Sequence, residues 1–328
     1  MLLGILQDLL SVWDRNSSVS WNVIQLTLSA EMITIQLSRR EKMPSKYAQS
    51  LETYSDIYKY PYRYAVHPFR IAGNIYYVGN AAVSSHLIDT GDGLILLDTT
   101  FPHTYPLLVN SIWEAGFSVY DIKYILHSHG HFDHFGGTIA LTALTKAKTF
   151  LGAPDARMFI ERPELSLGID CPYCYMELFK PDVEIEDGQI ISLGNTEIKA
   201  VLTPGHSPGV ISFIIKVNNG NETFTAGMQG GAGLNTLNMD YMEYFHFGAS
   251  EVAEIRKSFL DGLKKLEKEK VDVPLGNHPN HNKTFEKYKK MRENPGAPNP
   301  FIDPAEWQIY LTETQDKFHK MLAEEGNP

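Results

Sequence analysis

Short runs of apolar residues separated by turn residues dominate the chain from residue 71 onward, a pattern typical of strands. Three such runs cover residues 75–78, 85–88 and 94–97, and a fourth covers residues 122–126. Gly91, Asp92 and Gly93 lie between the second and third runs, and these residue types tolerate the positive φ angles of a tight hairpin. We therefore expect residues 85–88 and 94–97 to pair as antiparallel strands.

Stretches with helical spacing of apolar residues alternate with these strands. Helices are predicted at residues 105–115, ended by Gly116, and at residues 138–146. A longer helix is predicted at residues 250–270, and a final helix begins with Asp303 as N-cap and Pro304 at the first helical position. Further strands are expected at residues 199–202, 211–217, 223–226 and 271–275. This mixed order of elements predicts an α/β fold.

The composition limits the possible partners. The chain has 328 residues, of which 43% are hydrophobic, enough to form a sizeable core. Its formal net charge of −10 argues against a nucleic-acid partner, because binding to phosphate backbones depends on a basic surface. No apolar run approaches the roughly 18 residues that a membrane-spanning helix needs. A small-molecule substrate is therefore expected, with neither nucleic acid nor membrane as partner.

The first part of the chain differs from the rest. Residues 1–42 match nothing in the segment that follows, so we expect an N-terminal extension, non-native or disordered, followed by one folded domain at residues 43–328. The first basic residue, Arg15, follows the first apolar stretch instead of preceding it, unlike a secretory signal. This predicts a cytoplasmic location, whereas a periplasmic or secreted location would follow if the true N-terminus differs.

The chain contains only two cysteines, Cys171 and Cys174, in a C-x-x-C pattern. Two cysteines are too few for a disulfide scaffold or for a thiolate zinc site. We interpret the two cysteines as a pair in a loop over the functional site rather than as a redox-sensitive flap, because the C-x-x-C spacing alone is a weak motif.

Four side chains that can bind metals follow the predicted strand 122–126 within six residues: His129, His131, Asp133 and His134. Two histidines that are two positions apart project the same way from extended backbone, whereas Asp133 and His134 can turn toward a second point. Zinc in proteins takes roughly four nitrogen, oxygen or sulfur ligands. The loop therefore provides part of the coordination of two metal ions, and each ion needs a further ligand from elsewhere.

Two other histidines are candidates for these further ligands. His206 lies in T-P-G-H-S-P-G directly after the predicted strand 199–202, and His278 follows the predicted strand 271–275. Either histidine considered alone would be interpreted as a hydrogen-bonded loop residue. Together with the cluster at residues 129–134, histidines at three strand ends indicate one shared metal centre.

The sequence H-x-H-x-D-H followed by two glycines, together with T-P-G-H-S-P-G, resembles the metallo-β-lactamase superfamily. Residues 68–79 and 299–304 are similar to the third subclass of class B β-lactamases in particular, so the resemblance covers about residues 65–325. It implies a four-layer αββα sandwich and a zinc-dependent hydrolase. Such an enzyme uses a metal-bound hydroxide to open a lactam-type amide or a related cyclic or acyl ester bond.

The resemblance also implies roles for single residues. His129, His131 and His206 would hold a first zinc ion, and Asp133, His134 and His278 a second one, with Asp133 also orienting the nucleophile as a catalytic residue. His127 would not be a ligand, and His281 competes with His278 for the second site. A lactonase or thioesterase would use the same ligands, and the ligand set alone does not distinguish a mononuclear iron dioxygenase.

The chain departs from the family pattern at one position. Many relatives have a bridging aspartate after the strand 223–226, whereas this chain has Met228 there, and a thioether is a poor zinc ligand. Subclass-three β-lactamases also lack this carboxylate, so two zinc ions are still expected, with weaker binding at the second site. The glycine-rich residues 230–233 differ from the serine-bearing stretch of those enzymes, which puts β-lactam hydrolysis itself in question.

Overall fold

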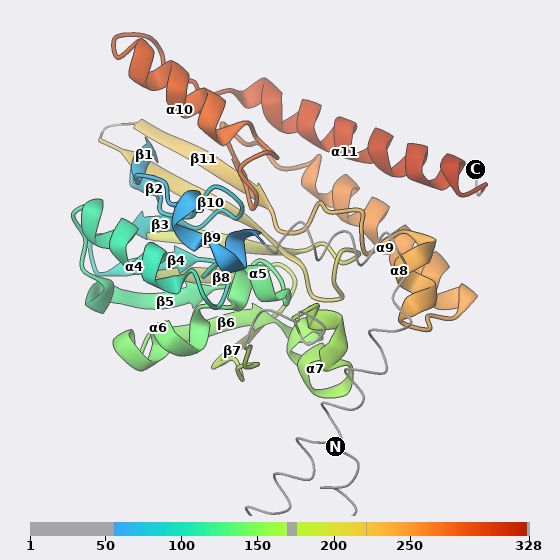
Figure 1. The fold of residues 1–328 in the computed structure, drawn as a ribbon. Coiled ribbons are helices and arrows are strands. Elements are labelled where there is room, and N and C mark those ends of the chain that lie inside the picture. Colours follow the sequence, from blue (N-terminus) through green and yellow to red (C-terminus); the bar gives the residue numbers. More distant parts are fainter. Residues whose placement is uncertain (1–55, 169–175, 221, 327–328) are drawn as a thin grey trace, which may run out of the picture. The chain divides into compact units, whose positions relative to one another are not determined.

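The computed structural model describes residues 56–168, 176–220 and 222–326 (Figure 1). The predictions for residues 1–42 and for Cys171 and Cys174 lie outside these residues. Within the described residues, no helix has both the length and the apolar character that crossing a membrane requires.

The first sheet has seven strands in sequence order: β1 Phe69–Ala72, β2 Ile75–Tyr77, β3 His86–Asp89, β4 Leu94–Leu97, β5 Ile122–Leu126, β6 Lys148–Gly152 and β7 Val183–Ile185. Strands β1 to β4 are antiparallel neighbours, and β4 to β7 run parallel. The predicted hairpin is confirmed, since β3 pairs antiparallel with β4. Gly91 and Gly93 in its turn have φ angles of 74° and 111°, which explains the need for glycine.

The second sheet has five strands in the order β12-β11-β10-β9-β8. Their bounds are β8 Ile190–Leu193, β9 Thr196–Leu202, β10 Ile211–Asn219, β11 Glu222–Gln229 and β12 Val273–Gly276. Strands β8 to β11 are antiparallel, whereas β12 is parallel to β11. The strands predicted in this region are confirmed, although β9, β10 and β11 are longer than their apolar runs indicated.

The helices are α4 Tyr105–Glu114, α5 Phe132–Phe135, α6 Thr138–Thr145, α7 Ala153–Glu161, α8 Met239–Tyr244, α9 Ala249–Leu266, α10 Thr284–Glu293 and α11 Pro304–Glu324. Short 3₁₀ turns cover Pro61–Tyr64, Val119–Asp121 and Pro163–Ser166. The N-cap of α11 is as predicted, since Asp303 accepts a hydrogen bond from the amide of Ala305. The long predicted helix at residues 250–270 ends at Leu266.

The two sheets pack face to face, and their inward side chains form one apolar core that includes Tyr77, Leu126, Phe213, Met228 and Leu275. A second apolar cluster joins the outer face of the first sheet to α4. Helices α4 and α6 lie on the side of the first sheet, and α9, α10 and α11 on the side of the second (Figure 1). The predicted αββα sandwich is confirmed.

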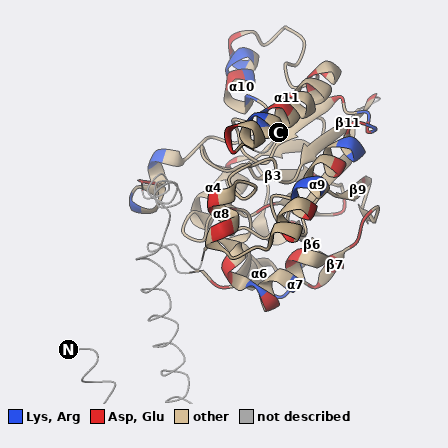
Figure 2. Cartoon of the chain, turned by 90° about the vertical axis from the view of Figure 1, so that its right-hand side faces the viewer, with Lys and Arg blue, Asp and Glu red and all other residues tan. Residues whose placement is uncertain are grey.

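Charged residues of both signs are interspersed along the outer helices (Figure 2). Ion pairs join some of them, such as Lys257 with Asp261 along α9 and Lys287 on α10 with Glu306 on α11. Charge of both signs is thus distributed over the surface of these helices.

Candidate metal centre

The histidine loop follows β5, where the apolar strand ends and buried polar residues begin. The amide of Ser128 donates to Asp98 and the amide of Gly130 donates to Asp155, so two buried carboxylates hold the loop backbone. His131 ends the extended segment with a φ of −96° and a ψ of 147°, and α5 begins one residue later. This change of backbone conformation directs Asp133 and His134 differently from His129 and His131, as the spacing predicts.

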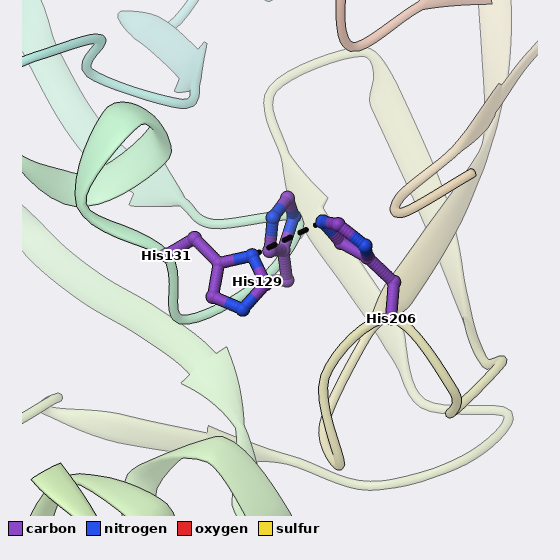
Figure 3. A group of neighbouring side chains, drawn as sticks. All are labelled: His129, His131 and His206. Atoms are coloured by element: carbon purple, nitrogen blue, oxygen red, sulfur yellow. Dashed lines mark hydrogen bonds between the residues drawn. The ribbon is translucent and has the colours of Figure 1, made fainter. Parts of the chain in front are cut away.

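The structure brings all six predicted ligands together. Potential ligand atoms of His129, His131 and His206 lie within 4.8 Å of one another, and so do those of His129, Asp133 and His134. His129 thus belongs to both groups. Figure 3 shows the rings of His129 and His131 on the loop after β5 facing the ring of His206, which comes from the loop after β9.

His278 completes the second group. Its Nε2 atom lies 3.2 Å from Nε2 of His134 and 3.7 Å from a carboxylate oxygen of Asp133, and that oxygen is 3.6 Å from Nε2 of His134. His281, the alternative ligand, instead contacts the side-chain oxygen of Asn277 through Nδ1, at 2.8 Å. The geometry therefore groups His278, rather than His281, with Asp133 and His134.

Hydrogen bonds on the far side of the rings fix which nitrogen carries the proton. Nδ1 of His278 lies 2.9 Å from the carbonyl of Ala82, and Nδ1 of His134 lies 2.8 Å from the carboxylate of Asp98. Both partners only accept hydrogen bonds, so each Nδ1 donates. In the neutral rings both Nε2 atoms then present lone pairs to each other, and a cation between them is needed to make that contact favourable.

In the first group, hydrogen bonds on the far side of the ring fix the protons of His206 and His129, whereas Nε2 of His131 is buried and has no hydrogen-bond partner among the described residues. Nδ1 of His206 donates to the carbonyl of Gly233 at 2.8 Å, which leaves a lone pair on the Nε2 atom that lies 3.0 Å from Nδ1 of His131. Ser128 donates its hydroxyl to Asp98 and therefore accepts from Nδ1 of His129. Nε2 of His129 is buried and has no hydrogen-bond partner among the described residues. Unpaired buried acceptors of this kind are typical of metal ligands.

The spacing and the protonation states both suit zinc. Two nitrogens at zinc–nitrogen distances of 2.0–2.1 Å in a tetrahedral site are separated by about 3.3–3.4 Å, close to the separations observed here. Burial and the neighbouring histidines lower the pKa of His129 and His131 well below the usual value, and burial lowers the pKa of His206 to about 4. These rings are therefore neutral at neutral pH, which is the form that binds metals.

The environment of His134 favours positive charge. Burial acts to lower the pKa of His134, but Asp133 and Asp98 outweigh it and raise the pKa above its usual value. Burial likewise opposes ionisation of Asp98, yet His134 and Ser128 hold the pKa of that carboxyl below its usual range. The ionised carboxylate of Asp98 accepts a hydrogen bond from Nδ1 of His134. It thereby orients the ring and stabilises a cation at the Nε2 atom.

Asp155, at the start of α7, connects the two loops of the first site. It accepts hydrogen bonds of 2.6 Å each from the amide of Gly130, the hydroxyl of Ser207 and the amide of Gly209. Burial raises the pKa of Asp155 to about 6 against the effect of these donors. Asp98 and Asp155 were not predicted from the sequence, since neither lies in the histidine motifs.

Two other sequence predictions concern residues beside the centre. His127 is fully buried, and its two ring nitrogens contact the carbonyl of Phe150 and the hydroxyl of Thr138, so both are used away from the metal centre. Met228, at the position of the missing bridging carboxylate, is 1% exposed and packs in the core between the sheets. The position is therefore filled by apolar packing.

An open cavity of about 470 Å³ lies over the two groups and contains His131, Asp133, His206 and His278 in its wall. The other lining residues are Ala81, Ala82, Phe132, Leu167, Gly233, Asn235, Asn277, Pro279, Asn280 and His281. Its volume is in the range of small-molecule sites. In the described part of the chain, no lysine or arginine lines this cavity.

The chain resembles known proteins of one superfamily in both sequence and fold. Residues 78–219 match the family model described as the metallo-β-lactamase superfamily. The structure is similar to the subclass B3 metallo-β-lactamase of Bradyrhizobium japonicum, with a TM-score of 0.69 and 30% identity, over 80% of this chain and 96% of that one. The chain belongs to the metallo-β-lactamase superfamily. The resemblance to subclass-three enzymes noted in the sequence is thereby confirmed.

Curated relatives of this superfamily member are matched over shorter segments. A hydroxyacylglutathione hydrolase of Maricaulis maris is 33% identical over 107 residues, which cover 33% of either chain. An N-acyl homoserine lactonase of Bacillus thuringiensis is 26% identical over 160 residues, or 42% of this chain and 59% of the relative. The matches thus span between a third and three fifths of these relatives, and the relatives' names differ in the substrate they specify.

Proposed function

We propose that this protein is a zinc-dependent hydrolase that opens a lactam-type amide or a related cyclic or acyl ester bond, with uncharged esters and lactones favoured over β-lactams. The observation that carries the proposal is the convergence of imidazole lone pairs, above all the facing Nε2 atoms of His134 and His278. Names of relatives support acyl-bond hydrolysis, since they include a β-lactamase, a hydroxyacylglutathione hydrolase and an N-acyl homoserine lactonase.

His129, His131 and His206 would hold the first zinc ion, and Asp133, His134 and His278 the second. Zinc bound there would supply a water of lowered pKa and a Lewis acid for the attacked carbonyl. Asp133 would accept a hydrogen bond from the nucleophilic water and orient it, because its carboxylate lies beside both His134 and His278 at the floor of the cavity.

His281 provides a further contact for substrate. Asn277 donates its amide to the carbonyl of Gly230, so its oxygen accepts from Nδ1 of His281. Burial and the nearby His278 lower the pKa of His281 well below its usual value, which keeps the ring neutral. Its Nε2 atom is then an acceptor on a residue that lines the cavity, suited to a substrate hydroxyl or amide hydrogen.

The charge of the cavity wall favours an uncharged substrate. Penicillins and cephalosporins carry a carboxylate beside the lactam ring, and a site that binds them tightly is expected to pair it with a cation. Since the described cavity wall contains neither lysine nor arginine, that contact would have to come from elsewhere. A lactone or a neutral ester has no such requirement.

The proposal is tested by steady-state hydrolysis with zinc-loaded protein and a panel containing a chromogenic cephalosporin, an N-acyl homoserine lactone, an acylated glutathione thioester and an aryl ester. We expect kcat/KM for a lactone or ester to exceed that for the cephalosporin roughly tenfold or more, since a hydrogen bond to a charged group contributes about 1.5–3 kcal/mol. Chelation should abolish turnover and added zinc should restore it. Absence of turnover with every substrate of the panel would contradict the proposal.

A further inference from the structure

A second cavity of about 230 Å³ adjoins the metal centre and shares His131 and His206 with the first cavity. One side consists of the loop of residues 204–208 that carries His206. Helices α8 and α9 and the segment around α7 form the other sides. A group in this cavity would therefore touch the same loop that positions a predicted metal ligand.

The walls of the second cavity are mainly apolar. Its apolar and aromatic lining residues are Met158, Leu165, Pro204, Pro208, Tyr241, Met242, Phe247 and Ile255. Met158 on α7 and Met242 on α8 allow the cavity to adapt to occupants of different shape, because the unbranched thioether side chain has several rotatable bonds.

Two buried hydroxyl groups of this wall, those of Ser207 and Thr236, already have partners. Ser207 donates its hydroxyl to Asp155, and Thr236 lies 3.1 Å from Nδ1 of His206. The acidic lining residue, Glu254, is exposed on α9. Within the described residues, no lysine or arginine lines this wall, and its interior suits a hydrocarbon group.

We propose that this cavity binds the apolar acyl chain of a substrate whose carbonyl lies at the metal centre, so that the enzyme prefers medium-chain acyl compounds. The inference rests on the proposed function and adds the substrate class to it. An apolar cavity of about 150 Å³ holds a benzene ring, so the volume here corresponds to a chain of roughly six to nine carbon atoms.

Binding of alkyl hydroxamic acids tests the inference without turnover. The hydroxamate group binds zinc, and the alkyl chain can be varied from two to about twelve carbons while the head group stays constant. Each methylene that enters an apolar cavity should tighten binding about fourfold. Isothermal titration calorimetry on the zinc-loaded full chain should show this gain up to roughly six to nine carbons and little gain beyond.

A substitution that fills the cavity provides a second test of the inference. Ser258 lines the cavity from α9 and is partly buried, so Ser258→Phe should remove most of the chain-length gain and leave binding of the two-carbon hydroxamate within about twofold of wild type. Ala253→Phe is the matched control, because Ala253 is exposed on the same helix and does not line the cavity. The control should keep the full chain-length gain.

The outcomes separate the two proposals. Zinc-dependent binding of the short hydroxamate with no chain-length dependence would overturn the acyl cavity and leave the proposed function standing. Equal chain-length dependence in wild type and Ser258→Phe would also overturn it. If the short hydroxamate fails to bind zinc-loaded protein at all, the metal centre itself is contradicted, and both proposals fall together.

Discussion

The Nε2 atoms of His134 and His278 lie 3.2 Å apart, although 144 positions separate the two residues along the chain. Their Nδ1 atoms donate to Asp98 and to the carbonyl of Ala82, so the facing atoms are both acceptors when the two rings are neutral. Repulsion between two lone pairs at this distance has to be offset by a cation. A single shared proton could satisfy one pair, but six convergent ligand atoms arranged in two groups favour metal ions.

Removal of a ligand should abolish activity without unfolding the protein. His206→Ala should lower kcat/KM by about 10³-fold or more, because the loss of one ligand disturbs both nucleophile and carbonyl activation. The thermal unfolding midpoint of the metal-free variant should stay within a few degrees of metal-free wild type, since the ligand lies in a loop after β9. Activity and circular dichroism, measured on the same preparations, check both expectations.

Asp133→Asn separates the two sites. The amide keeps the size of the side chain and loses its charge, so the affinity for the second metal ion should fall more than that for the first. Competition with a chromogenic chelator resolves the two binding steps. Equal weakening of both steps would contradict the assignment of Asp133 to the second site.

Asp98→Asn tests the residue behind His134. Asn tolerates the φ of 60° that position 98 requires, so the backbone should be retained. The charge that faces His134 is lost, and the affinity of the second site for zinc should fall about 10–100-fold, as for other residues that orient metal-binding histidines. Unchanged zinc affinity of both sites would show that Asp98 only stabilises the fold.

Asp155→Ala should affect the first site in particular. The substitution leaves the buried amides of Gly130 and Gly209 without their acceptor, which should destabilise the protein by about 3 kcal/mol. Because these amides flank His129, His131 and His206, zinc affinity at the first site should fall as well. Asp182→Ala is a control away from the metal centre, since the exposed Asp182 accepts two hydrogen bonds, both from Thr149. It should lower stability only.

The stability should depend on pH through His86. Burial lowers the pKa of His86 from 6.5 to about 4, so between these values the unfolded chain binds the proton more readily than the folded chain. This contribution to stability is complete above about pH 6.5 and is lost as pH falls toward 4, about 3 kcal/mol in all. Urea unfolding at pH 7.5 and pH 4 should show that the free energy of unfolding decreases less at acid pH for His86→Leu than for wild type. An identical decrease in the two proteins would refute this.

Most of the fold could be predicted from the sequence where the elements are long or apolar. Strand β5 was predicted with its final bounds, and the start of α11 follows from Asp303 and Pro304. Strands β7 and β8 were not predicted, because their residues alternate between exposed and buried over only three or four positions. Helix α8 has six residues, too few for a helical period to be recognised.

The candidate ligands could be predicted because their spacing is local, whereas the carboxylates that hold them could not. Asp98 follows β4 and Asp155 lies in α7, and only the folded chain brings them to the histidine loop. The sequence also placed Met228 at the bridging position, but only the structure shows that its side chain is packed in the core. Contacts of this kind depend on tertiary packing and leave no local pattern.

The central claim is most directly tested by the zinc content of protein purified without chelators, measured by elemental mass spectrometry and repeated for His278→Ala. The account predicts about two zinc ions per wild-type chain and about one in the variant, since four donors bind each zinc ion in a typical site and the second site loses one of its three protein ligands. Iron as the main metal, or wild-type protein that binds no zinc even after zinc is added in excess, would contradict it.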